Sequence, residues 1–80
     1  MKILVLCSQR DYYYINVSKE EKIDYGYLWY FVSQKRYIKL VGCYEDLSEE
    51  DYNKIKENKY YFDSLYSFYS LYSFYKKMKK

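Results

Sequence analysis

The chain has 80 residues, a formal net charge of +3 and a hydrophobic fraction of 50%, which limit it to one small domain with a single modest core. It contains no histidine, which excludes Ser-His and Cys-His nucleophile pairs and the usual histidine-containing zinc sites. Its two cysteines are too few for a disulfide framework or a cysteine-only metal site, so we expect no enzyme activity, no cofactor and no metal ion.

Two strands are predicted near the start of the chain, over residues 2–7 and 12–17. The first contains a continuous apolar run, which is typical of a strand buried on both faces. The second is rich in aromatic and β-branched residues, which favour strands. Alternation along it would place Tyr13, Ile15 and Val17 on one face of the sheet.

The opening Met1–Ser8 resembles the strand-then-cysteine start of low-molecular-weight tyrosine phosphatases and of phosphotransferase IIB domains. In the phosphatases, that resemblance implies a nucleophilic cysteine followed by an arginine at a Cys-x5-Arg spacing. Tyr13 stands at that position, and no glycine-rich phosphate loop follows. We therefore interpret Cys7 as an inert thiol in a reducing compartment.

No membrane or secretion signal is predicted. The apolar run at the start is too short for a signal peptide, and no run approaches the roughly 20 apolar residues that cross a bilayer. We therefore expect a cytoplasmic protein without a membrane partner.

A hairpin is predicted in the middle of the chain, with strands over residues 27–32 and 37–44 joined by residues 33–36. Both segments are rich in residues that favour strands. A four-residue connection brings apolar residues opposite one another without a slip in register. The expected pairs are Val32 with Tyr37, Phe31 with Ile38, and Trp29 with Leu40.

Two helices are predicted in the second half, over residues 48–58 and 61–77. Ser48 is a favourable N-cap, and acidic residues follow it in the first turn. The final segment has apolar residues at steps of three and four, which predicts a helical stripe. The stripe consists of Tyr61, Leu65, Phe68, Tyr72 and Tyr75. The expected fold is α+β, a small antiparallel sheet of about four strands covered by one or two C-terminal helices.

Tyrosine is the most unusual feature of the composition, because fifteen Tyr accompany only four Phe. A buried phenol needs a hydrogen-bond partner, and a core of this size cannot supply so many. Many rings should therefore keep their hydroxyls in water, as at protein interfaces, and the surplus also favours a homodimer. Ordinary half-exposed packing on a thin domain is the alternative interpretation.

An acidic cluster precedes and begins the first predicted helix. Its simplest role is N-capping and solvation of that helix. The second interpretation is a knob that meets an Arg/Lys-rich groove on a partner and imitates a nucleic-acid backbone. The predicted partner-binding residues are Glu45, Asp46, Glu49, Glu50, Asp51, Tyr66 and Tyr69.

The leading functional hypothesis is a small non-catalytic protein-binding module. The chain lacks Ala, Thr and Pro and is rich in Lys, Tyr and Ile, which indicates an A/T-rich genome such as that of a low-GC bacterium or its phages. Small proteins of phages and other mobile elements include inhibitors of host defence nucleases. We therefore expect a stoichiometric, anti-CRISPR-like inhibitor of a larger host protein, such as a nucleic-acid-binding complex.

The alternative hypothesis is a single-stranded nucleic-acid-binding protein. Aromatic rings that stack on bases and lysines that meet the backbone are the chemistry of such binding. The residues that would carry it are Tyr66, Tyr69, Tyr72, Lys76, Lys77, Lys79 and Lys80.

Overall fold

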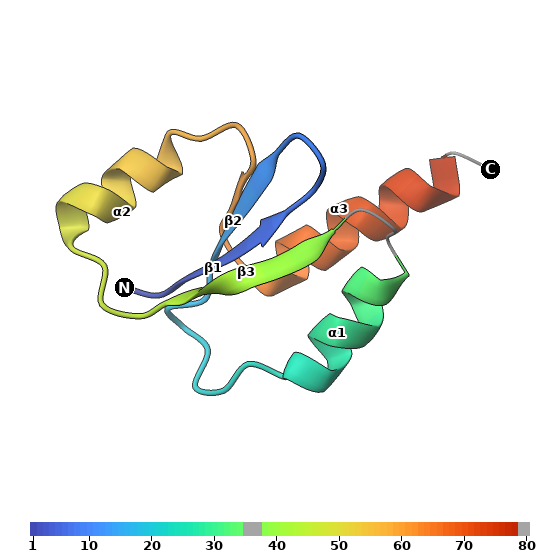
Figure 1. Cartoon of the computed structure of the whole chain (residues 1–80), viewed down its shortest axis with the longest axis horizontal. Helices are drawn as coiled ribbons and strands as arrows, with labels where there is room; N and C mark the ends of the chain where they lie inside the picture. The colour runs from blue at the N-terminus through green and yellow to red at the C-terminus, as the bar shows by residue number, and fades with distance from the viewer. Residues whose placement is uncertain (35–37, 79–80) are drawn as a thin grey trace.

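The computed structural model describes the backbone of residues 1–34 and 38–78, and the side chains of residues 1–34 and 38–71. Within these residues a four-stranded sheet, in the order β3-β1-β2-β4, is accompanied by three helices (Figure 1). The elements are β1 (Ile3–Cys7), β2 (Tyr12–Asn16), α1 (Tyr25–Ser33), β3 (Lys39–Tyr44), α2 (Glu49–Lys56), β4 (Tyr61–Phe62) and α3 (Leu65–Met78). The predicted α+β class is confirmed.

Strand β1 lies inside the sheet, antiparallel to both β2 and β3. Its side chains alternate between two hydrophobic clusters. Leu4 and Leu6 belong to the larger cluster, which includes residues of α1 and α3, whereas Ile3 and Val5 pack with Tyr52 of α2. The prediction that this strand is buried on both faces is confirmed.

Strand β2 also has the predicted alternation. Tyr13, Ile15 and Val17 are buried in the larger cluster, whereas Tyr14 packs against the smaller one. The expected all-antiparallel sheet is wrong in one respect, because β4 pairs parallel to β2, with Tyr14 opposite Tyr61. A parallel neighbour requires a crossover connection, and the segment that contains α1, β3 and α2 supplies it.

The prediction of a strand over residues 27–32 is wrong, because this segment lies in helix α1. The Asp24 carboxylate caps the helix by accepting a hydrogen bond from the backbone N–H of Tyr27 at 3.0 Å. Leu28, Phe31 and Val32 are buried together at helical spacing. Tertiary packing of this face therefore overrides the local strand preference of an aromatic sequence.

The predicted hairpin register fails together with that strand. Leu40 pairs with Leu6 of β1, not with Trp29. Strand β3 begins at Lys39, and the predicted first residues of that strand include Tyr37, which lies outside the described residues. The fourth strand of the sheet is β4, which was predicted as the start of a helix.

Helix α2 is close to its predicted position. The Ser48 hydroxyl accepts a hydrogen bond from the backbone N–H of Asp51 at 3.2 Å, which confirms the predicted N-cap. Tyr52 is buried and Ile55 packs beside it. The helix ends at Lys56, two residues before the predicted Asn58, whose side-chain amide donates to the Ile55 carbonyl oxygen at 3.0 Å.

Helix α3 begins at Leu65, later than the predicted residue 61, because Tyr61 and Phe62 pair with β2 instead. The Ser64 hydroxyl accepts a hydrogen bond from the backbone N–H of Ser67 at 3.1 Å, which satisfies an amide in the first turn. Leu65 and Phe68 of the predicted stripe are buried. The side chains of Tyr72 and Tyr75 lie outside the described residues.

Phe68 provides a direct test of this core, because its ring is fully buried against Phe31 at 5.7 Å and Phe62 at 5.3 Å between ring centroids. We expect Phe68→Leu to lower the free energy of unfolding by about 1–2 kcal/mol, a fraction of the cost of a buried Phe→Ala change. Chemical denaturation followed by circular dichroism measures this value. Tyr66→Leu on the same helix is the control, because 79% of Tyr66 is exposed. Equal losses in both variants would contradict the packing of α3.

Candidate protein-binding surfaces

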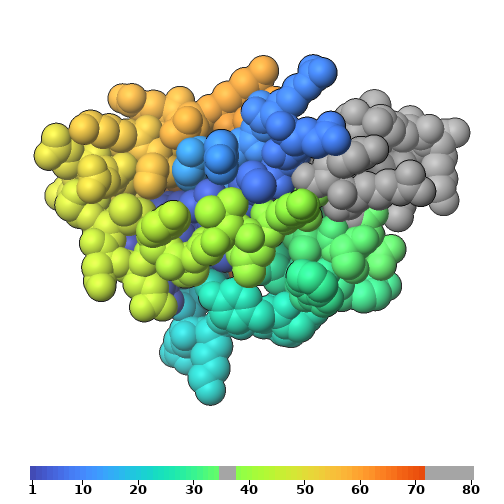
Figure 2. Space-filling model, in the orientation of Figure 1, coloured from blue at the N-terminus to red at the C-terminus, as the bar shows by residue number. Residues whose placement is uncertain are grey.

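Strand β3 forms an edge of the sheet, and among the described residues it pairs only with β1. Leu40 and Val41 are 42% and 46% exposed, and Tyr44 near them is 53% exposed. In the space-filling view the strand lies uncovered between α1 and α2 (Figure 2). Such an edge offers unpaired backbone N–H and C=O groups together with apolar side chains.

A bulge makes this edge irregular. Val5 is opposite Gly42 and Leu6 is opposite Leu40, so Val41 is an extra residue without a partner on β1. Bulges bend and twist the strand that contains them. Here the bulge coincides with two successive exposed apolar side chains on β3.

Helix α1 extends this apolar surface. Trp29 is 70% exposed, and Tyr25 one turn earlier is 49% exposed on the same side of the helix. Burial raises the pKa of the Tyr25 phenol, and the neighbouring Cys43 and Glu45 add to that rise, so Tyr25 lies beside the end of β3. We name this set the β3 surface; it consists of Tyr25, Trp29, Leu40, Val41 and Tyr44.

The predicted acidic residues border the β3 surface. Glu45 and Asp46 directly follow β3, and Glu49, Glu50 and Asp51 form the first turn of α2. All five are exposed. The only ion pair that this cluster makes within the described residues joins Glu50 to Lys54 at 3.8 Å between two highly exposed side chains, so it contributes little to stability. Most of this negative charge faces solvent.

An apolar groove connects the acidic turn with the sheet. Its volume is about 340 Å³, and Tyr44 and Asp51 contribute to its walls. The groove is lined by Val5, Tyr14, Tyr44, Leu47, Asp51, Lys54 and Ile55. Tyr44 is opposite Ile3 in the sheet, so this groove adjoins the end of β3 on the face that α2 covers.

The tyrosines beneath α2 show how some phenol hydroxyls find hydrogen-bond partners in the interior. The Tyr52 and Tyr61 hydroxyls lie 2.8 Å apart, and the Asn16 amide donates to the Tyr52 hydroxyl at 3.0 Å. Burial raises the pKa of Tyr61, and its hydrogen bond with Tyr52 raises it further. These phenols have partners in the interior, whereas Tyr25, Tyr44 and Tyr66 are largely exposed.

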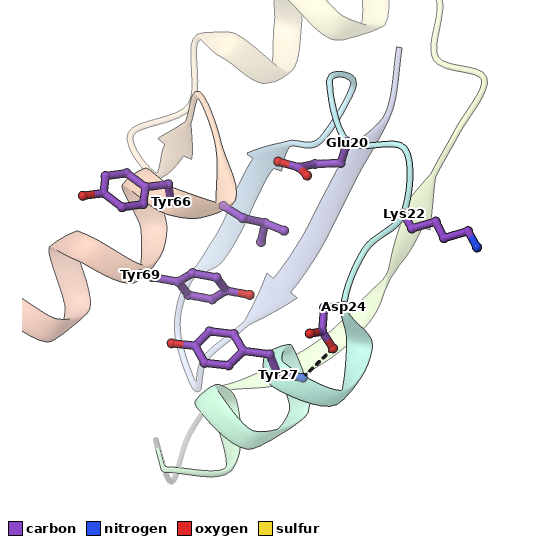
Figure 3. Close-up of a pocket in the computed structure, with 7 residues that line it drawn as sticks. Glu20, Lys22, Asp24, Tyr27, Tyr66 and Tyr69 are labelled. Atoms are coloured by element: carbon purple, nitrogen blue, oxygen red, sulfur yellow. Dashed lines mark hydrogen bonds between the residues drawn. The ribbon is translucent and has the colours of Figure 1, made fainter.

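Tyr66 and Tyr69 line a second groove, to which no residue of α2 contributes. Figure 3 shows it between α1, α3 and the loop that precedes α1. It has a volume of about 290 Å³ and is lined by Glu20, Lys22, Asp24, Tyr27, Leu65, Tyr66 and Tyr69. Tyr69 packs against Phe31 at 4.6 Å and edge-on to Tyr27 at 5.0 Å between ring centroids. The predicted partner-binding residues therefore belong to two surfaces.

The electrostatics of this groove are acidic around Tyr69. Burial raises the pKa of the Tyr69 phenol from 10.0 to about 12, and the neighbouring Tyr27, Asp24 and Glu20 add to that rise. Sequence reasoning missed Glu20, Asp24 and Tyr27 as site residues. One sequence signal could have found part of this site, because Asp24 is a favourable helix N-cap residue and lies three residues before Tyr27.

The residues of the nucleic-acid hypothesis are only partly described. Tyr66 and Tyr69 line a groove that also contains two carboxylates, which repel phosphate groups. The remaining side chains of that hypothesis, from Tyr72 to Lys80, lie outside the described residues. Within the described part of the chain, no group of three or more potential ligands is placed to hold a metal ion, and no helix is both long and apolar enough to cross a bilayer.

Both cysteines are free, half-buried thiols. Burial raises the pKa of Cys43, and the nearby Glu45 carboxylate raises it further. Since the thiolate is the reactive form, this environment lowers the reactivity of Cys43 at neutral pH.

Comparisons with known proteins place no relative beside this chain. No protein-family model matches it, and neither the curated proteins nor the solved structures include a significant match. Its candidate surfaces therefore have to be interpreted from their own residues.

The raised pKa of Tyr69 predicts a pH dependence of stability. Between pH 10, where the unfolded phenol ionises, and pH 12, where the folded one does, only the unfolded chain loses this proton, so stability falls as pH rises. Chemical denaturation at pH 9 and at pH 11 measures the free energy of unfolding at each pH. The decrease in this free energy from pH 9 to pH 11 should be smaller for Tyr69→Phe than for the parent chain. Tyr66→Phe, which removes a 79% exposed phenol, should behave like the parent chain. An identical decrease in the free energy of unfolding in all three proteins would contradict the burial of Tyr69.

Proposed function

We propose that this chain is a small non-catalytic protein-binding module that covers a basic area on a larger protein. The observation that carries the proposal is the β3 surface, an open sheet edge with five exposed apolar side chains beside five exposed acids. Trp and Tyr are the residues that most often dominate binding energy at protein interfaces. An exposed edge strand can also add a strand of the partner through backbone hydrogen bonds.

The size of the molecule is compatible with such an interface. A standard interface takes about 800 Å² from each partner, which is roughly an eighth of the 6288 Å² surface of this chain. The acidic turn and the groove beside α2 both adjoin the end of β3, so a partner that lies along this edge can contact all three. In this arrangement the aromatic side chains form the centre and the acids form the polar rim.

The acidic rim favours a partner with a basic surface. Complementary charge accelerates association and discriminates against wrong partners. Proteins that bind nucleic acids present Arg/Lys-rich grooves to phosphates. We therefore propose a stoichiometric inhibitor that occupies such a groove in a host defence nuclease, in the manner of an anti-CRISPR protein from a phage or another mobile element.

A homodimer through β3 is the competing use of the same edge. The bulge at Val41 interrupts the regular ladder that two copies of β3 would need to pair edge to edge. We therefore rank a different protein ahead of a second copy. Light scattering at increasing concentration should report a monomer of 10.1 kDa, and a stable dimer that Val41→Lys dissociates would contradict this ranking.

Matched variants test the proposed function. The tagged chain is used to capture proteins from lysates of low-GC bacteria, and each captured protein is purified and titrated by calorimetry. A true partner should bind with 1:1 stoichiometry, and Trp29→Ala should weaken binding about tenfold or more, as expected for a central aromatic residue. Tyr30→Ala is the control, because Tyr30 is 63% exposed on the same helix but lies outside the β3 surface.

The charge of the rim is tested with the same partner, by measuring association rates with surface plasmon resonance. Glu49→Lys in the first turn of α2 should slow association, whereas Glu57→Lys at the other end of that helix should have a smaller effect. The partner should also lose its nucleic-acid binding when the complex forms. The proposal fails if no protein is captured, or if every captured protein binds all four variants equally.

A further inference from the structure

The groove between α1 and α3 combines aromatic rings with carboxylates. In Figure 3 the Glu20 and Asp24 carboxylates lie on two sides of the Tyr69 hydroxyl, with the Tyr27 ring beside Tyr69. The Lys22 side chain lines the groove but points away from these rings. The interior of the groove is therefore acidic, and its aromatic wall comes from two different helices.

The two carboxylates are not neutralised by the described residues. Neither Glu20 nor Asp24 forms an ion pair there. Lys2 approaches this loop, but its ammonium group donates to the backbone carbonyl of Glu20 at 2.6 Å. One oxygen of Asp24 accepts the N-cap hydrogen bond from Tyr27. The second oxygen of Asp24 and both carboxylate oxygens of Glu20 accept no hydrogen bond within the described part of the chain, so they can accept hydrogen bonds from a ligand.

The aromatic wall is suited to a cation. The Tyr27 and Tyr69 rings meet at 5.0 Å between centroids in a T-shaped arrangement, and Tyr27 is 48% exposed, so part of its ring is accessible to a ligand. Tyr66, which is 79% exposed, also lines the groove, but in Figure 3 its ring points away from Tyr27 and Tyr69. The faces of tyrosine rings attract cations, and the attraction grows where water is partly displaced.

We propose that this groove binds the guanidinium group of an arginine side chain from a partner protein. A guanidinium group is planar, so it can stack on a tyrosine ring while its N–H groups donate to carboxylates at its edges. A lysine ammonium lacks the plane and the fork of donors, so it fits this combination less well. A nucleic-acid strand would bring phosphates to the two carboxylates, which is unfavourable.

The dimensions of the groove agree with one side chain. Its volume of about 290 Å³ lies at the lower limit of typical small-ligand pockets, about 300–1,000 Å³. The site goes beyond the proposed function, because none of its lining residues belongs to the β3 surface or to the acidic turn of α2. It offers a second contact point, on the α1–α3 side of the molecule.

Nuclear magnetic resonance titration of the isotope-labelled full chain tests the assignment. The probes are a blocked Gly-Arg-Gly peptide, its Gly-Lys-Gly and Gly-Glu-Gly counterparts, and a short oligothymidylate. The arginine peptide should shift the amides of residues 20–27 and 65–69 in a saturable manner. The lysine peptide should bind more weakly, and the glutamate peptide and the oligonucleotide should leave these amides unchanged.

Variants assign the shifts to the groove. Glu20→Gln and Tyr27→Ala should each weaken binding of the arginine peptide about twofold to fivefold, the size expected of one exposed ionic or cation–π contact. Glu57→Gln, an exposed acid on α2, should not change the affinity, and neither should Trp29→Ala on the β3 surface. The last variant separates this inference from the proposed function, because either one can fail without the other.

Three results would overturn the assignment. One is an oligonucleotide that shifts the same amides as strongly as the arginine peptide. Another is an arginine peptide that binds Glu20→Gln and the parent chain equally well. The third is a shift of these amides with protein concentration alone, which would assign the groove to a second copy of the chain.

Discussion

Burial of β1 on both of its faces is the constraint on which the rest of the molecule depends. Ile3, Leu4 and Leu6 are fully buried, and a buried side chain of this kind contributes about 1.5–3 kcal/mol relative to an exposed one. A strand with apolar residues on both faces requires a layer on each side of the sheet. Helices α1 and α3 cover one face, and α2 covers part of the other, as the two hydrophobic clusters show.

This arrangement separates the surfaces of the molecule. Since α1 and α3 converge over one face, their aromatic side chains meet the loop that carries Glu20 and Asp24. Since α2 covers only part of the other face, the connection after β3 and the first turn of α2 leave five acids in solvent beside the open edge of β3. The two acidic and aromatic areas arise from the layers of the fold. They provide separate contact points on a small domain.

Part of the fold could be predicted from the sequence because some segments fit one structure only. The apolar run of β1, the alternation in β2 and the Ser48 cap of α2 are of this kind. The segment 27–32 was different, because its aromatic and β-branched residues favour a strand while Leu28, Phe31 and Val32 also have helical spacing. Only the burial of that helical face against the sheet favours the helix over the strand. Strand β4 has two residues, too few for a periodic pattern.

The candidate sites also differ in how far they could be predicted from the sequence. The acids near α2 are consecutive or nearly so, and their exposure follows from their role at the start of a helix. The groove around Tyr69 joins residues 20–27 to residues 65–69, which are distant in sequence. No local pattern connects those segments. Tyr66 and Tyr69 were predicted to bind a partner together with the acids near α2, but α3 and the acidic turn contribute to two different grooves.

Amide hydrogen exchange, measured residue by residue, tests the central claim that β1 is enclosed while β3 is an open edge. Amides of β1 should exchange most slowly, because they are released only when the whole domain unfolds. Along β3, slowly exchanging amides bonded to β1 should alternate with rapidly exchanging amides that face solvent. In spectra of the same sample, α1 should show the nuclear Overhauser contacts between successive amides that are typical of a helix. Uniformly slow exchange along β3, together with cross-strand contacts between Trp29 and Leu40, would contradict the open edge of β3 and show that residues 27–44 form a hairpin.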